Sequence, residues 1–520
     1  MEIRTAGVVG LGTMGAGIVE VFARAGLDVV AVEIDDALLA AGRKRLEGSL
    51  GKAVDRGKLD ATDRDAIVSR VTFTTDRADL ARADLVTEAV PERMDIKASL
   101  FAELDRICPE HTVLATNTSS LPVTKIATST GRPDRVVGMH FFNPAPVMKL
   151  VEVVHTVRTD DEVTCAVTAL AEQCGKTPVV VGDRAGFVAN ALLFGYLNAA
   201  ARAAETGQAV VADIDAAIVA ACGLPMGPLT LMDLIGLDVC LDVMETMFDE
   251  TRDQRYAPAP LLRRLVMAGD LGRKTGRGYY RYDAGPATPW LSAPDFANGS
   301  CRTSSSVVAV GEGRSRVLDL LPDITRVAPA DVGEADVVMI DGGSRSASAE
   351  LLARVAKTAK PGAVLAVAAM DEAPVTALLA GTDRAGDVVG VHVPRTPRGG
   401  VVEVVATIRS EADAVATVVD GLRHAGLTAI ACRDRPGYVV DYLVLPHLGD
   451  AVRMVDDGYA SREDVDVAMR LGCGYAAGPF AMLAAIGADE VRSVLSHLAA
   501  ATHLPSLAPS PLLDELAALG

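Results

Sequence analysis

Short apolar runs and stretches with helical spacing alternate along the first part of the chain. The apolar runs predict buried strands at 5–10, 27–33, 71–75, 83–90 and 112–120. Apolar residues recur at helical spacing over 16–26, 36–70 and 92–107. Regular alternation of strands with helices predicts an α/β fold with a doubly wound parallel sheet, which binds ligands where its strands end.

The later part of the chain repeats this organisation. From residue 186 to 283 the pattern is helical throughout, and residues 284–305 are rich in Pro, Ser, Ala and Gly, as linkers are. Three later segments align with earlier ones: 388–407 with 136–156, 434–458 with 183–207, and 463–487 with 212–236. The sequence therefore predicts a sheet domain (1–184), an all-helical domain (185–283), a linker (284–305), a degenerate repeat of the sheet domain (306–433) and a second helical domain (434–520).

A glycine-rich loop, Gly10-Leu11-Gly12-Thr13-Met14-Gly15, stands between the first strand and the first helix. The next strand ends on Glu33, 18 positions after the last glycine. In a Rossmann domain such a loop lets the backbone approach a pyrophosphate, and the acidic residue binds the adenosine ribose. Because a carboxylate repels a 2′-phosphate, Glu33 favours NAD over NADP. The repeat keeps only two of the glycines, so we expect no dinucleotide site there.

His140 ends an apolar run, and Glu152 follows 12 residues later, beyond a turn through Pro144 and Pro146. Imidazole exchanges protons near neutral pH, and a carboxylate on its far nitrogen fixes the tautomer and stabilises the imidazolium. From these residues alone, a catalytic pair and a buried structural pair are equally good interpretations.

The repeat keeps the pair as His392 and Glu403 but changes its surroundings. Arg395 stands where the first copy has Asn143, Asp441 where it has Asn190, and Asp371 where it has Ser119. A fold is inherited more readily than a complete site. We therefore expect the second half to be structural.

Composition narrows the class of protein. The net charge of -18 argues against a nucleic-acid-binding surface, and half of the 520 residues are apolar without a run long enough to span a bilayer. Eight cysteines lack a CxxC pair, and no metal-ligand cluster is visible, so we expect reduced thiols in a cytoplasmic protein without a metal.

Six motifs, taken together, resemble the L-3-hydroxyacyl-CoA dehydrogenase family, and its bacterial 3-hydroxybutyryl-CoA members most closely. They are GLGTMG, DLVTEAVPERMDIK, NTSS, GMHFFNPAPVMKLVEV, GFVAN and LGRKTGRGYY, in this order within residues 3–283. The remainder is similar to longer bacterial members with a degraded second copy, some of which act on 3-hydroxyadipyl-CoA in phenylacetate breakdown. The chain departs from the family pattern at Ala185 and Ala191, which stand in place of a Pro and an Arg.

The resemblance implies NAD-dependent oxidation of a short-chain (S)-3-hydroxyacyl-CoA in fatty acid β-oxidation. It implies a catalytic set with His140 as general base oriented by Glu152, assisted by Ser119 and Asn190. It implies dinucleotide contacts at residues 10–15 and at Glu33, Glu92, Lys97, Ser119, Asn143 and Lys274. It implies substrate contacts at Ser119, Asn143 and Asn190, with Lys52 and Arg56 meeting the coenzyme A phosphates; otherwise these two belong to a solvated helical face.

Three alternatives stay open at this stage. A hydroxyisobutyrate-type dehydrogenase shares the plan but uses a lysine and lacks the HFFNP signature. A sugar-acid dehydrogenase of the lens-crystallin-like branch shares the His–Glu pair without coenzyme A contacts. A non-enzymatic binding module is our preferred interpretation only for residues 306–520. We expect either a pseudo-dimer within one chain or a homodimer.

Overall fold

The computed structural model describes residues 1–282, 285–291, 294–302, 306–313, 316–369, 374–396 and 398–519. Asp371 and part of the predicted linker lie outside these residues. The chain divides into two compact units, and each unit takes segments from both halves of the sequence. The first comprises Met1–Ala191, Asp249–Thr251 and Asp457–Gly474; the second comprises Leu192–Phe248, Arg252–Asp456 and Tyr475–Gly520. The five-part division made from the sequence stays a prediction.

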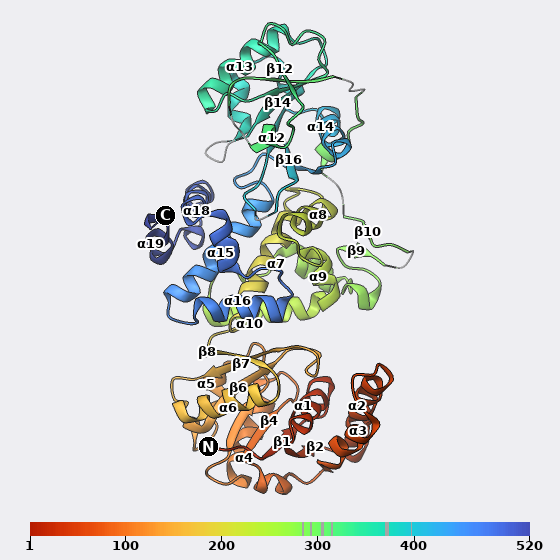
Figure 1. The fold of residues 1–520 in the computed structure, drawn as a ribbon, viewed down its shortest axis with the longest axis vertical. Helices are drawn as coiled ribbons and strands as arrows, with labels where there is room; N and C mark the ends of the chain where they lie inside the picture. Colours follow the sequence, from red (N-terminus) through yellow and green to blue (C-terminus); the bar gives the residue numbers. More distant parts are fainter. Residues whose placement is uncertain are drawn as a thin grey trace. The chain divides into compact units, whose positions relative to one another are not determined.

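The first unit contains an eight-stranded sheet with the order β3-β2-β1-β4-β5-β6-β7-β8. The strands are β1 (Thr5–Val9), β2 (Asp28–Val32), β3 (Val71–Thr74), β4 (Leu85–Glu88), β5 (Val113–Thr116), β6 (Val136–Phe141), β7 (Leu150–His155) and β8 (Thr177–Gly182). All neighbours pair in parallel except β6 and β7, which are antiparallel. The predicted doubly wound sheet is confirmed, and its one antiparallel pair follows from the Pro-rich turn between β6 and β7 (Figure 1).

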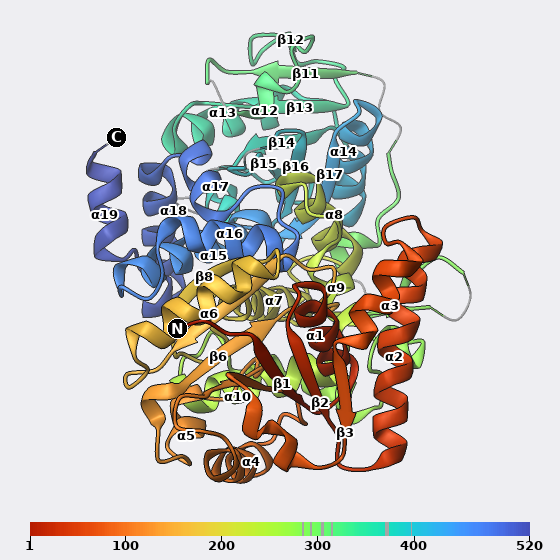
Figure 2. The same ribbon diagram turned by 60° about the horizontal axis from the view of Figure 1, so that its bottom comes forward.

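Helices cover both faces of this sheet. Helices α1 (Thr13–Arg24) and α6 (Asp161–Gln173) share one core with the sheet, and α2 (Asp36–Asp55) and α3 (Ala61–Ser69) pack beside α1 and β3 (Figure 2). The stretch 36–70, predicted as helical, is therefore two helices. The opposite face carries α4 (Met94–Ile107), α5 (Val123–Ala127) and α16 (Arg462–Cys473), the last of which packs on β7 and β8.

The alternation of side chains along β6 and β7 decides where the candidate chemistry lies. Met139 and Phe141 of β6 and Val151 and Val153 of β7 belong to the core under α1 and α6. Successive side chains of a strand point to opposite faces, so the residue between each of these pairs points the other way. The face covered by α4, α5 and α16 therefore holds the candidate site.

The second unit contains a seven-stranded sheet with the order β12-β11-β13-β14-β15-β16-β17. Its strands are β11 (Val307–Val310), β12 (Thr325–Arg326), β13 (Val337–Ile340), β14 (Val364–Ala368), β15 (Val388–His392), β16 (Val401–Ala406) and β17 (Thr428–Arg433). Helices α13 (Arg345–Thr358) and α14 (Ala412–His424) belong to separate cores on its two faces. The order repeats that of the first sheet without an equivalent of β3, and α12 (Arg316–Asp319) has only four residues where α1 has twelve.

The helices of the second unit come from both helical copies. The first copy supplies most of α7 (Ala189–Glu205) and α10 (Leu237–Thr251), together with α8 (Val211–Cys222), α9 (Pro228–Ile235) and α11 (Pro260–Met267). The second copy supplies α15 (Val440–Asp456), α17 (Pro479–Ile486), α18 (Ala488–Thr502) and α19 (Pro511–Ala518). Helix α8 packs on β16 and β17 of this unit, as α16 packs on β7 and β8 of the first. Each sheet is thus covered by a helix from the other half of the sequence.

Candidate active site

His140 and Glu152 face each other across the antiparallel β6–β7 pair. They are register partners, and Nδ1 of His140 lies 2.7 Å from Oε2 of Glu152. Because a carboxylate only accepts, the ring donates from Nδ1. The other oxygen of Glu152 accepts the backbone N–H groups of Val188 and Ala189, at 3.1 and 3.0 Å. Both carboxylate oxygens are therefore occupied, and Glu152 is fully buried.

The second ring nitrogen of His140, Nε2, makes no hydrogen bond with any residue in the described part of the chain. His140 itself is 6% exposed. A neutral imidazole that donates from Nδ1 carries its lone pair on Nε2. The geometry thus presents a nitrogen that can accept a proton, with the tautomer set by Glu152 behind it.

Two phenylalanine rings flank the imidazole, and the sequence analysis gave neither a role. The ring centroid of Phe142 lies 4.6 Å from that of His140, and the centroid of Phe187 lies 5.6 Å away. Phe187 has φ of +47°, a strained conformation for a bulky residue. This turn aims the N–H groups of Val188 and Ala189 at Glu152. The phenylalanines of HFFNP and GFVAN were visible in the sequence, but motif spacing does not show which face a ring covers.

Ser119 and Asn190 come together near the pair. The Asn190 amide lies 3.4 Å from the backbone oxygen of Ser119, and the Ser119 N–H donates to Oε1 of Glu92 at 2.9 Å. Asn190 enters the site on the first turn of α7, immediately after the two N–H donors to Glu152. The structure therefore brings Ser119 and Asn190 together, while the roles expected for them stay predictions.

Lys97 is fully buried between two carboxylates, with its ammonium 2.6 Å from Glu88 and 3.2 Å from Glu92. Burial acts to raise the pKa of Glu92, but the charge of Lys97 and the hydrogen bonds from Thr118 and Ser119 outweigh it and lower that pKa. The Lys97 side chain is only 1% exposed, whereas that of Glu92 is about a third exposed (36%). The dinucleotide contacts expected for these two residues stay predictions.

The glycine loop has the shape that a pyrophosphate requires. Gly10 has φ of +89°, and a Cβ on Gly15 would lie 1.7 Å from the carbonyl oxygen of Gly10. A Cβ on Gly12 would meet nothing within 4 Å, and Gly12 begins α1 without a side-chain cap. The first N–H groups of the helix are therefore available to an anion. Glu33 braces this loop by accepting the Leu11 N–H at 2.6 Å. The residues present fit NAD.

Four predicted residues lie apart from this cluster. Lys52 sits in the last turn of α2 and Arg56 at its end; both are exposed, and neither side chain forms an ion pair with the described residues. Asn143 is exposed in the turn after β6. Lys274 belongs to the second unit, where its ammonium pairs with Asp238. These positions neither support nor contradict the ligand contacts implied for them.

The repeated pair is built in the same way but has different neighbours. Nδ1 of His392 lies 2.8 Å from Glu403, whose other oxygen accepts the N–H groups of Val439 and Val440. Nε2 of His392, however, lies 3.7 Å from Oδ2 of the buried Asp441, which also pairs with Arg395 at 3.2 Å. Side chains of the protein thus occupy the place that a substrate would need.

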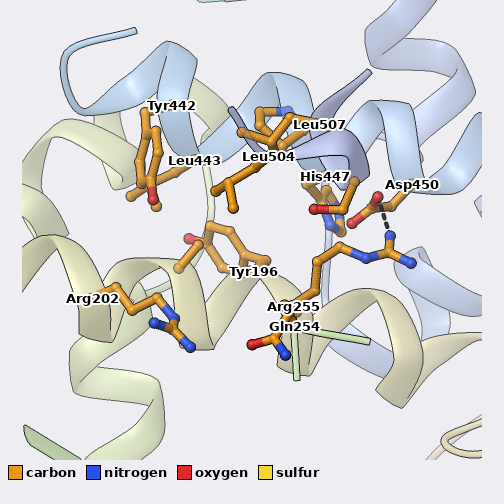
Figure 3. A pocket seen from close by; sticks show the side chains of 14 residues that line it. Tyr196, Arg202, Gln254, Arg255, Tyr442, Leu443, His447, Asp450, Leu504 and Leu507 are labelled. Atoms are coloured by element: carbon orange, nitrogen blue, oxygen red, sulfur yellow. Dashed lines mark hydrogen bonds and ion pairs between the residues drawn. The ribbon is translucent and has the colours of Figure 1, made fainter. Parts of the chain in front are cut away.

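The second unit also contains a pocket of about 190 Å³ between α7, α15 and residues 504–507 (Figure 3). Tyr196 and His447 line it, and their ring centroids lie 5.6 Å apart. None of the predicted site residues lines this pocket. Among the described residues, no group of acidic, His or Cys side chains could hold a metal ion, and no helix is long and apolar enough to cross a membrane.

A Rossmann sheet with an open glycine loop, next to a buried His–carboxylate pair, defines a dinucleotide-dependent dehydrogenase. The profile of the 3-hydroxyacyl-CoA dehydrogenase NAD-binding domain matches residues 5–184, and that of the same family's C-terminal domain matches twice, at 186–282 and 437–520. The chain belongs to the 3-hydroxyacyl-CoA dehydrogenase family. Its cofactor is NAD, and the second match of the C-terminal domain confirms the helical repeat.

Similar proteins cover either half or all of the chain. A 3-hydroxybutyryl-CoA dehydrogenase of Mycobacterium tuberculosis is 49% identical over 54% of this chain and 99% of its own length. The 3-hydroxyadipyl-CoA dehydrogenase of Escherichia coli is 33% identical over 96% of this chain and 94% of its own length. A crystal structure of a 3-hydroxybutyryl-CoA dehydrogenase from Escherichia coli covers 100% of this chain and 99% of that one, with a TM-score of 0.79 and 32% identity.

Proposed function

We propose that the protein oxidises a short-chain (S)-3-hydroxyacyl-CoA, such as 3-hydroxybutyryl-CoA, to the 3-ketoacyl-CoA with NAD. The observation that carries this proposal is the His140–Glu152 pair, whose Nε2 side is left open while every oxygen of the carboxylate is engaged. The family and the half-length relative named for 3-hydroxybutyryl-CoA support the substrate class.

His140 is the general base in this mechanism. Its Nε2 takes the proton of the C3 hydroxyl, and Glu152 holds the ring and stabilises the imidazolium that results. Ser119 and Asn190 donate to the oxygen on C3 as its charge grows. NAD, when bound on the Gly10–Gly15 loop, supplies the acceptor for the hydride that leaves C3. The alcohol thus loses one proton to His140 and one hydride to the cofactor.

A second candidate substrate is 3-hydroxyadipyl-CoA. The Escherichia coli relative named for it aligns with both halves of this chain, whereas the 3-hydroxybutyryl-CoA dehydrogenase of Mycobacterium tuberculosis covers one half. The Escherichia coli crystal structure named for 3-hydroxybutyryl-CoA also covers both halves, so coverage alone does not decide the substrate. A panel of CoA thioesters, with and without a terminal carboxylate, separates the two by kcat/KM. Free hydroxyacids in the same panel test the sugar-acid alternative, in which Lys52 and Arg56 would meet no phosphate.

His140→Ala tests the proposal, with His155→Ala as its control, because His155 is exposed on the adjacent strand. We expect His140→Ala to lower kcat by about 10²–10⁴-fold, the usual contribution of a positioned base, without changing the Kd for NAD. The control should keep the activity of the parent protein. Near-normal turnover of His140→Ala overturns the assignment.

We also propose that one chain forms a pseudo-dimer in the cytoplasm. The exchange of α8 and α16 between the two halves supports the pseudo-dimer, and eight unpaired cysteines suit a reducing compartment. The mass of the protein in solution distinguishes a monomer of 54.1 kDa from a homodimer.

Lys52 and Arg56 are the residues that we propose to bind the coenzyme A phosphates. A loss of affinity for the CoA thioester in a Lys52→Ala variant would support this proposal.

A further inference from the structure

A segment of the second repeat is part of the unit that holds the candidate active site. Tyr459, just before α16, donates its hydroxyl to the backbone oxygen of Gly182 at the end of β8. The Arg184 guanidinium lies 5.6 Å from the centroid of the Tyr459 ring and pairs with Asp457 at 3.3 Å. These contacts hold α16 against β8 and β7, the second of which pairs with the strand that carries His140.

Gly472, in the last turn of α16, lies close to the residues at the ends of β6 and β7. A Cβ at this position would lie 2.7 Å from Cδ2 of Leu150 and 3.1 Å from Cε1 of Phe142. Distances this short leave no room for a side chain unless a neighbour moves. Leu150 begins β7, two residues before Glu152, and Phe142 follows β6, two residues after His140.

Phe142 links the helix to the imidazole. Its ring contacts Gly472 on one side and lies 4.6 Å from His140, at an interplanar angle of 51°. Cys473, the next residue, lies close enough to Glu152 for that charge to add to the effect of burial, which raises the pKa of the thiol to about 12. Helix α16 therefore lies close to both members of the His–Glu pair, next to His140 through Phe142 and next to Glu152 through Cys473.

We propose that Gly472 is a positioning residue for the dehydrogenase reaction: the second repeat sets the place of His140 through Phe142. The degenerate half then has a function in catalysis, although its own His–Glu pair is blocked. This inference rests on the proposed role of His140. The equivalent position of the first copy is Ala221 in α8, which holds a fully buried methyl group.

Gly472→Leu tests the proposal, with Ala221→Leu as the matched control. The two substitutions add a similar volume at the same place in the two copies, and both crowd the face with which the helix packs on its sheet. We expect Gly472→Leu to lower kcat about ten- to hundredfold, as a displacement of up to 1 Å does, and to shift the pH profile of kcat. The Kd for NAD should not change. The kcat of folded Ala221→Leu protein should equal that of the parent protein.

A compensating variant separates positioning from a loss of folding. Phe142→Leu removes ring volume, so the double variant with Gly472→Leu should regain part of the kcat that Gly472→Leu loses. A Gly472→Leu protein that is less stable but has unchanged kcat and pH profile would overturn the proposal. So would equal losses of kcat in Gly472→Leu and Ala221→Leu. If His140→Ala is active, the proposed function itself fails, whatever Gly472 does.

Discussion

The Nε2 atom of His392 lies 3.7 Å from the Oδ2 atom of Asp441, a fully buried carboxylate. The first copy has Asn190 at the equivalent position, a neutral amide directed at the backbone of Ser119. The residue at this position therefore lies beside Nε2 of the imidazole in the second copy, where Arg395 also pairs with Asp441. Since Glu403 occupies the other nitrogen of His392, the second ring is held between two carboxylates and has no free face for a substrate.

Removal of His392 should affect stability and not turnover. We expect His392→Gln to lower the free energy of unfolding by about 1–3 kcal/mol, the usual cost of leaving a buried hydrogen-bonding group without its partner. The kcat per folded molecule should stay that of the parent protein. Urea unfolding and steady-state kinetics measure the two effects, with His424→Gln, at an exposed position, as the control. A loss of kcat in folded His392→Gln would contradict a purely structural second pair.

Replacement of Glu152 by glutamine should lower kcat by about 10²–10⁴-fold. A carboxylate accepts from His140 and from two backbone N–H groups at once, whereas an amide must turn its NH₂ toward one of these donors. The tautomer of the ring is then no longer fixed. The measurement is kcat at saturating substrate and NAD, and Glu172→Gln, at an exposed position of α6, should show no loss. Retention of full activity would remove Glu152 from the mechanism.

Glu33→Gln should weaken discrimination between NAD and NADP. The charge that repels a 2′-phosphate is lost, so kcat/KM with NADP should rise relative to NAD. Glu33 also holds the loop through the Leu11 N–H, so kcat/KM with NAD should fall about ten- to hundredfold, since a hydrogen bond to a charged group is worth ~1.5–3 kcal/mol. Initial rates with each cofactor give the two kcat/KM values. Glu47→Gln, on α2, is the control. An unchanged NADP-to-NAD ratio would refute this role.

His447 should make the protein sensitive to acid. The His447 ring lies near those of Tyr196 (Figure 3) and Tyr475. Burial lowers the pKa of His447 to about 4, from an unfolded value of about 6.5. Between these values the unfolded chain binds the proton and the folded one does not. The free energy of unfolding therefore falls as the pH drops from about 6.5 to 4, by roughly 1.4 kcal/mol per pH unit.

The test of this pH dependence compares urea unfolding at pH 7 and pH 5 in the parent protein and in His447→Gln. The variant should lose less stability on acidification than the parent, because glutamine does not titrate. His503→Gln, at an exposed position, should behave like the parent protein. Equal losses in all three proteins would show that other groups cause the acid sensitivity.

Prediction from the sequence succeeded where local patterns carry the information. Short segments contain the glycine loop, Glu33 and the alternating strands. The doubly wound sheet could therefore be predicted from them. The return of Glu152 to His140 was also predictable, because one proline-rich turn separates the two strands. The roles of Phe142, Phe187 and the N–H groups of Val188 and Ala189 were not, since hydrophobic spacing does not specify which ring faces which.

The sequence by itself determined the sheet, the glycine loop, the His–Glu pair, the family and the existence of the repeat, because each is encoded by residues close together or by direct similarity. Only the tertiary structure decided that His392 is blocked by Asp441 and that Gly472 lies against Phe142, some 330 positions away. Contacts of this kind depend on how whole helices pack, and packing is the sum of many weak, non-local interactions.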